Sequence, residues 1–74
     1  MPALPITQAL VEPLSDRELQ ILRLLAAYLS STEIGNELYI SVNTVRYHTK
    51  NIYDKLNVHT RKDAIQRAKE LGLL

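Results

Sequence analysis

The apolar residues of this chain recur, from position 14 onward, at intervals of three and four positions, the period of amphipathic α-helices. Each apolar run begins at a serine or threonine, whose hydroxyl can accept a hydrogen bond from a free backbone N–H group at a helix start. These candidate N-cap residues are Ser15, Ser30, Ser41 and Thr60. Glutamate follows the first two of them three residues later, the spacing of a capping box. The pattern therefore predicts four helices.

The predicted helices cover most of the domain and have short connections. They span residues 16–27, 31–38, 42–56 and 60–71. The wide apolar stripe of the first indicates a central helix that several others contact. Gly35, inside the second, indicates a close approach by another helix, since glycine costs up to about 1 kcal/mol in a helix interior. Only Tyr39 and Ile40 lie between the second helix and Ser41, the N-cap candidate of the third, so the second and third helices must cross steeply. We therefore predict an all-α fold, a four-helix bundle that contains a helix-turn-helix with the third helix as its recognition helix.

Length and composition limit the chain to one domain. Residues 1–13 contain three prolines and no helical period, so we interpret them as a flexible N-terminal linker or tail, and residues 14–74 as the domain. Hydrophobic residues make up 46% and charged residues 23% of the sequence, values typical of a soluble globular domain. The absence of cysteine excludes disulfides and thiolate metal sites.

Several other function classes have no support in the sequence. No apolar run approaches the roughly 18 residues of a membrane span, and the start lacks the basic region of a secretory signal. We therefore expect a cytoplasmic protein with no membrane contact. His48 and His59 lack metal-ligand spacing and are better explained as a packed residue and a turn residue. No glycine-rich phosphate loop or nucleophile motif occurs, so we expect no cofactor, no metal and no enzymatic activity.

Charge is distributed unevenly along the chain. Residues 1–40 carry two basic and five acidic side chains, whereas residues 41–74 carry seven basic and three acidic ones. The net charge of +1 conceals this asymmetry. Small domains often segregate charge by chance, but a basic half can also present one face to a polyanion.

The third predicted helix has two contrasting faces. The inward face holds Val45, Thr49, Ile52 and Leu56. The outward face holds Asn43, Arg46, Tyr47 and Lys50. A solvated surface is the plain explanation of such a polar stripe. However, the charges in its first two turns are all positive, where the helix dipole disfavours cations, which favours an arriving anion.

Nucleic acid fits this outward face, because the major groove admits one helix and the second helix of a helix-turn-helix reads base edges there. Arg46 can bridge the O6 and N7 atoms of guanine, Lys50 can do so less rigidly, and Tyr47 suits a thymine methyl or a sugar. Donors at the helix start suit a phosphate, and these are Ser41, Asn43 and Thr44. Later cations suit the flanking backbone, and these are Lys55, Arg61 and Lys62. Asp54 lies further along the same face, so we expect the helix to leave the groove before it.

The chain resembles the LuxR-type, or GerE-like, helix-turn-helix domain of bacterial transcription regulators. The segments that carry the resemblance are residues 14–18 (LSDRE), 22–26 (LRLLA), 30–34 (SSTEI), 40–48 (ISVNTVRYH) and 50–56 (KNIYDKL), with Arg61 after them. The resemblance extends from residue 14 to residue 74, about four-fifths of the chain, in order and without gaps. The resemblance implies that the third helix is the recognition helix, that the last is a common dimer surface, and that Glu18 has a structural role.

The family's functional positions fall on residues of this chain. The resemblance implies base contacts by Arg46, Tyr47 and Lys50. It implies phosphate contacts by Thr32, Asn43, Thr44, Lys55 and Arg61. The sequence departs from the family where Tyr28 replaces a frequent glycine, Ser31 and Thr32 a frequent Asn-Lys pair, Gly35 a usual alanine, and Tyr47 a smaller residue. The last of these leaves the recognised bases open.

The sequence predicts sequence-specific binding of double-stranded DNA by the C-terminal output domain of a bacterial regulator. The ending, residues 68–74, resembles that of the large ATP-binding, maltose-regulator-like subgroup, and a response-regulator or small autoinducer-type parent is the alternative. We expect a monomer in isolation and a homodimer on DNA through the Ala64 and Ala68 side of the last helix, although core packing explains these alanines equally well. RNA polymerase is a further candidate partner. The alternative function is a helical protein-interaction module that uses the same basic face on an acidic partner.

Overall fold

The described part of the chain, residues 13–74 in a computed structural model, consists of four α-helices and contains no strand. The helices are α2 (Asp16–Ala26), α3 (Ser31–Leu38), α4 (Val42–Leu56) and α5 (Arg61–Glu70). The predicted all-α fold is confirmed. The linker predicted for residues 1–13 lies, apart from Pro13, outside the described residues. No helix in the described range combines the length and the apolar character that crossing a bilayer requires.

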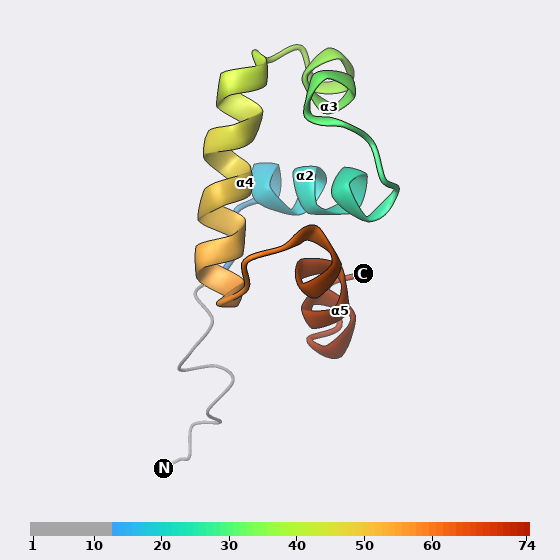
Figure 1. Cartoon of the computed structure of the whole chain (residues 1–74), viewed down its shortest axis with the longest axis vertical. Helices are drawn as coiled ribbons and strands as arrows, with labels where there is room; N and C mark the ends of the chain where they lie inside the picture. The colour runs from blue at the N-terminus through green and yellow to red at the C-terminus, as the bar shows by residue number, and fades with distance from the viewer. Residues whose placement is uncertain (1–12) are drawn as a thin grey trace.

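The other three helices pack against α4, the longest helix (Figure 1). In this view α4 stands upright, α3 lies beside its N-terminal end, and α5 lies beside its C-terminal end. The central helix α2 contacts α3, α4 and α5, as its wide apolar stripe predicts. α3, the three-residue connection 39–41 and α4 form the predicted helix-turn-helix.

The helix starts match the capping signals of the sequence. The backbone N–H of Glu18 donates to Ser15 Oγ at 3.1 Å, and the N–H of Ser15 donates to Glu18 Oε1 at 2.9 Å. Ser30 and Glu33 form the same reciprocal pair, at 3.1 Å and 2.8 Å. Ser41 and Thr60 cap α4 and α5 through one hydrogen bond each. Each such cap is worth about 1 kcal/mol, so local chemistry fixes where the helices begin.

Three helix ends are closed by non-glycine residues with left-handed backbone conformations. Asn57, which ends α4, has φ of 58°. Tyr28 follows α2 with φ of 65°, and Tyr39 follows α3 with φ of 59°. The Tyr28 position is the one where the family often has glycine, the residue for which this conformation carries no steric cost.

One contiguous core joins all four helices. Its fully buried large side chains are Ile21, Leu22, Leu25, Ile34, Val45, Ile52 and Leu56. The inward face predicted for α4 supplies three of these side chains, with Thr49 half-buried beside them. Because this side of α4 is buried in the core, the opposite side of the helix must point outward.

Gly35 has the packing reason that the sequence indicated, but the neighbour is different. A Cβ atom at Gly35 would lie 2.6 Å from the backbone oxygen of Ile40 and 3.6 Å from Val45 Cγ2. The closest approach is thus made by the backbone of the turn rather than by a neighbouring helix. The absent side chain allows the turn to fold back tightly between α3 and α4.

Ala64 and Ala68 lie in the core of this chain and not on its surface. Both are fully buried, and α5 packs on α2 and α4. The prediction that a dimer forms through the Ala64 and Ala68 side is therefore wrong, because that side already packs within one subunit. The signal of two alanines four residues apart reflects close helix packing, the alternative that the sequence left open.

Candidate nucleic-acid interface

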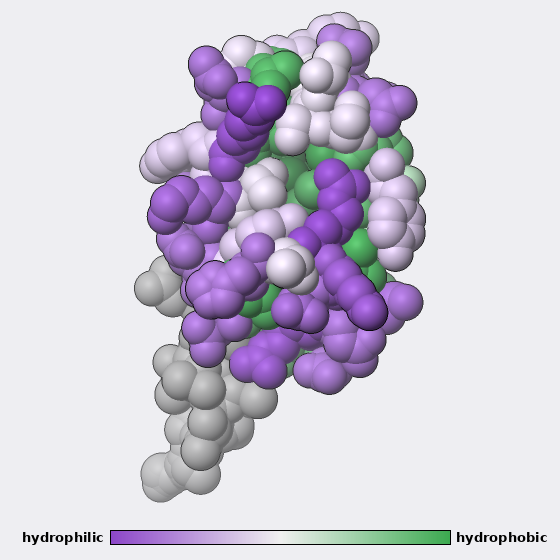
Figure 2. All heavy atoms as spheres, viewed as in Figure 1, coloured by the Kyte–Doolittle hydropathy of each residue, from purple (hydrophilic) through white to green (hydrophobic). Residues whose placement is uncertain are grey.

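The first half of α4 presents the three predicted base-reading residues together on its outward face. Arg46, Tyr47 and Lys50 are exposed, while Val45, on the other side of the same helix, is fully buried. Tyr47 is 65% exposed, and its ring meets that of half-buried His48 edge to face, with centroids 5.6 Å apart. The hydropathy view shows hydrophilic side chains along the α4 side of the molecule (Figure 2). The sequence-predicted grouping of these three residues is present in the structure.

The start of α4 has exposed donors of the kind that bind phosphate. The hydroxyl of Ser41 accepts from the backbone N–H of Thr44 at 3.1 Å and lies 2.9 Å from the Thr44 hydroxyl. Helix geometry leaves the N–H groups of Val42 and Asn43 without an intrahelical partner. Asn43 is exposed, and Thr32 is exposed in the first turn of α3. These residues meet the general requirement for an anion contact at a helix start.

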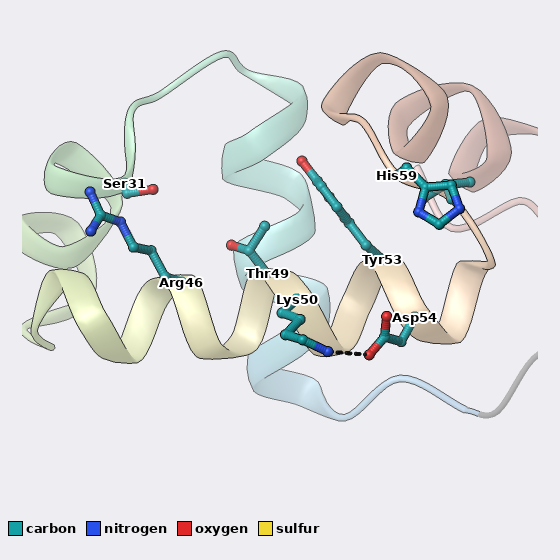
Figure 3. A pocket seen from close by; sticks show the side chains of 8 residues that line it. Ser31, Arg46, Thr49, Lys50, Tyr53, Asp54 and His59 are labelled. Carbon is teal, nitrogen blue, oxygen red and sulfur yellow. Dashed lines mark hydrogen bonds and ion pairs between the residues drawn. The ribbon is translucent and has the colours of Figure 1, made fainter.

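An open groove of about 410 Å³ runs beside this face (Figure 3). It is lined by Ser31, Arg46, Thr49, Lys50, Tyr53, Asp54, Val58 and His59. The start of α3 contributes Ser31 at one end, α4 supplies most of the floor, and the connection to α5 contributes His59 at the other end. Two of the predicted base-reading residues, Arg46 and Lys50, therefore border a groove that also contains an acid.

Lys50 forms an ion pair with Asp54 that the sequence analysis did not predict. Its Nζ atom lies 3.0 Å from Oδ2 of Asp54, one turn further along α4. Both side chains are exposed, so this pair is worth at most about 0.5 kcal/mol and can open when another acceptor arrives. The four-residue spacing of Lys50 and Asp54 is a signal from which the pair could have been predicted.

Lys55, a predicted phosphate contact, is half-buried and bonded within the protein. Its Nζ atom donates to Oε1 of Glu18 at 2.8 Å and to the backbone oxygen of Pro13 at 3.3 Å. Burial alone would raise the pKa of the Glu18 carboxyl, but hydrogen bonds from Lys55 and Ser15 and the charge of Lys55 lower it overall. The carboxylate is thus charged, and it joins the start of α2 to the end of α4.

Arg61, the other late phosphate candidate, also has an internal partner. Its Nη1 atom donates to the backbone oxygen of Leu25 at 3.2 Å, at the C-terminal end of α2, where the helix dipole favours a cation. Burial raises the pKa of the nearby Tyr53 hydroxyl, and the charge of Arg61 offsets only part of that rise. The structure thus places Lys55 and Arg61 apart from the three exposed residues on α4 and gives each a role in holding helices together.

Comparison with known proteins places this helix-turn-helix in a family. The model of the family described as "Bacterial regulatory proteins, luxR family" (GerE) matches residues 12–68. The chain belongs to the LuxR family. Membership is typical of DNA-binding transcription regulators, and the LuxR-type domain is a regulatory rather than a catalytic one.

Individual LuxR-family relatives are similar over most of this chain. It is 41% identical over 59 residues to the HTH-type transcriptional regulator MalT of Vibrio cholerae, a match that covers 80% of this chain but 6% of that protein. The crystal structure of the response regulator ChrA of a heme-sensing two-component system superposes with a TM-score of 0.82 and 40% identity, over 85% of this chain and 31% of ChrA. The structure of the transcription factor GerE superposes with a TM-score of 0.77 and 41% identity, over 82% of this chain and 91% of GerE.

Proposed function

We propose that this chain binds double-stranded DNA sequence-specifically, with the first half of α4 in the major groove. The observation that carries the proposal is the joint exposure of Arg46, Tyr47 and Lys50 on the face of α4 opposite its buried side. In a helix-turn-helix this part of the second helix meets base edges. Membership of the LuxR family supports the same function.

Each exposed residue has a distinct proposed role. Arg46 suits the two acceptors of a guanine, because its planar guanidinium donates in a fixed fork. Lys50, one turn on, donates to a base edge or a phosphate. Tyr47 is large enough to contact a thymine methyl or a sugar.

The proposed phosphate contacts fall into two groups. The first group lies at helix starts with exposed or half-exposed donors, and consists of Thr32, Ser41, Asn43 and Thr44. The second group consists of Lys55 and Arg61, whose donors are engaged with Glu18 and Leu25. In the first group the Ser41 and Thr44 hydroxyls bond each other at 2.9 Å, but no contact between helices has to break to meet a phosphate, so we expect this group to contribute more than the second.

In the cell, we propose that the domain is the output module of a larger cytoplasmic regulator. The chain covers only a small part of the transcriptional regulator MalT and under a third of the response regulator ChrA, which supports a role as one module among several. We propose that the chain is a monomer alone and pairs on two-fold symmetric DNA through α5. This contact would use the exposed side of α5, where Gln66 and Lys69 lie, since the alanine side is buried. Contact with RNA polymerase would follow from the position on promoter DNA.

The direct test is selection of preferred duplexes from a randomised 20-base-pair library, followed by affinity measurements on the selected sequence and on single-base-pair variants of it. Arg46→Ala should weaken binding to the selected duplex by about 1–3 kcal/mol and relax discrimination at one base pair. Thr32→Ala, a matched change at a phosphate position, should weaken all sequences alike. The division into base and phosphate contacts would be contradicted if Arg46→Ala and Thr32→Ala lost the same affinity and the same discrimination between base pairs.

The same selection distinguishes DNA binding from the alternative function, a protein-interaction module. If no sequence is enriched and the chain instead binds an acidic protein through Arg46 and Lys50, the outward face of α4 is a protein-interaction surface and the DNA proposal fails.

A further inference from the structure

The outward face of α4 carries one acidic residue, Asp54, whose presence does not stabilise the helix. Asp54 is the only acidic residue in α4 and lies in its last turn, where the helix dipole disfavours an anion. Its pair with Lys50 has the lysine N-terminal to the acid, the less favourable order for an i,i+4 pair on a helix. The side chains of Lys50 and Asp54 are 75% and 63% exposed, so water screens their attraction. The acid therefore contributes little to the folded state.

The position of Asp54 relates it to the proposed DNA contact. It borders the same groove as Arg46 and Lys50, and the side chain of Lys50 bends along the helix toward it rather than away from α4 (Figure 3). The 3.0 Å ion pair offsets the charge of one of the two cations on this face. An ammonium group has three donors, so Lys50 can keep one bond to Asp54 while it donates another to a base.

Building on the proposed function, we infer that Asp54 is a specificity-determining residue that acts by positioning Lys50. Binding to random DNA depends on free positive charge near phosphates, and Asp54 reduces that charge. Binding to a preferred sequence depends on a donor held at a base edge, and Asp54 holds the ammonium of Lys50 beside α4. The acid thus lowers affinity for random DNA more than for the selected sequence.

The test is the affinity of purified variants for the selected duplex and for a random 20-base-pair duplex over a range of salt concentrations. Asp54→Asn should bind the random duplex roughly three- to tenfold more tightly at low salt, with a salt slope steeper by about 0.9, the value for one added phosphate contact. Affinity for the selected duplex should change less than twofold, so the ratio of the two affinities falls. Thermal unfolding should stay unchanged, which a purely structural role for Asp54 would not predict.

Two further variants make the result specific. Glu70→Gln removes the same charge from an exposed residue of α5 that pairs with Arg67 at 3.9 Å, and it should leave the ratio unchanged. In a Lys50→Ala background, Asp54→Asn should change the ratio less than twofold, because the residue that Asp54 positions is gone.

The inference is overturned if Asp54→Asn changes the ratio no more than Glu70→Gln does, or if the ratio falls as far without Lys50 as with it. Either result leaves the proposed function intact, provided that the unsubstituted chain binds DNA. Failure of the unsubstituted chain to bind any duplex removes the proposed function itself.

Discussion

At the scale of single residues, the molecule holds two tyrosines in backbone conformations that suit glycine. Tyr28 and Tyr39 have φ values near 60°, and their side chains are 73% and 94% exposed. A left-handed conformation costs an L-residue roughly 1–2 kcal/mol, and such exposed rings gain little packing in return. Gly35 is the opposite case, a position where the absence of a side chain is required by the backbone of Ile40. The two tyrosines place their conformational cost in the connections between helices, whereas Gly35 places the cost of a helical glycine inside α3.

Replacing Tyr28 with glycine should stabilise the domain. Glycine relieves the strain at a φ of 65° but adds conformational entropy to the unfolded chain, so we expect a net gain of up to about 1 kcal/mol. Urea denaturation of the variant measures the change. Tyr28→Ala is the matched control, because it removes the same ring and keeps the strained conformation. A gain as large for alanine as for glycine would show that the ring, and not the backbone, is unfavourable.

Replacing Gly35 with alanine should destabilise the domain, even though alanine is the better helix former. The new Cβ atom would lie 2.6 Å from the Ile40 oxygen, so the turn must shift, at a cost of about 1–3 kcal/mol. Thermal unfolding against Asn36→Ala, an exposed change at the next position of α3, isolates the steric effect. A stability equal to that of the Asn36 control would mean that the turn accommodates a methyl group freely.

At the scale of the elements, the sequence predicted what local chemistry determines and missed what the chain brings together from afar. Capping spacings and apolar periods placed all four helices to within about a residue at most ends, because a helix start depends on the neighbouring three or four residues. Glu18 was correctly given a local capping role, but its second partner, Lys55, is 37 positions away, and no local pattern signals it. The contact of Arg61 with the Leu25 oxygen, 36 positions away, is of the same kind.

The Glu18–Lys55 contact should make stability depend on pH below neutrality. Since the pKa of Glu18 is lower in the folded protein than its ordinary 4.5, its charge stabilises the fold above that pH, and the stabilisation is lost as the pH falls through the lowered value. Lys55→Ala leaves the buried carboxylate without its cation, so at pH 7 we expect a loss of about 1–3 kcal/mol. Without Lys55, the pKa of Glu18 is lowered less, because only the hydrogen bonds with Ser15 then oppose the effect of burial, and acidification should cost less stability.

Urea denaturation between pH 7 and pH 3 measures this dependence. Lys50→Ala is the matched control, because it breaks an exposed ion pair and should change stability by less than about 0.5 kcal/mol at every pH. The account of Glu18 is contradicted if Lys55→Ala is as stable as this control, or if both variants lose stability equally on acidification.

At the scale of the whole molecule, the arrangement gives α4 a buried side and an exposed side. The buried side joins the other three helices, and the exposed side carries the residues that the sequence selected from charge and helix period. The outward face could be predicted because a helical wheel needs no tertiary information. The buried side of α5 could not be predicted, because Ala64 and Ala68 fit a subunit contact and a core contact equally well until the packing of α5 is known.

The central claim is that the outward first half of α4 is a DNA-binding surface. The most direct measurement is fluorescence anisotropy of a labelled random 20-base-pair duplex over a salt series, with the unsubstituted chain and the Arg46→Ala, Lys50→Ala double variant. A double variant at Arg17 and Arg23, each changed to alanine, removes the same charge from α2.

For the unsubstituted chain, we expect log affinity to fall linearly with log salt, by about 0.9 for each phosphate contact. The slope should become shallower by roughly one to two units in the α4 double variant and should stay the same in the Arg17 and Arg23 variant. Absence of binding at low salt, or equal slopes in the two double variants, would contradict the account.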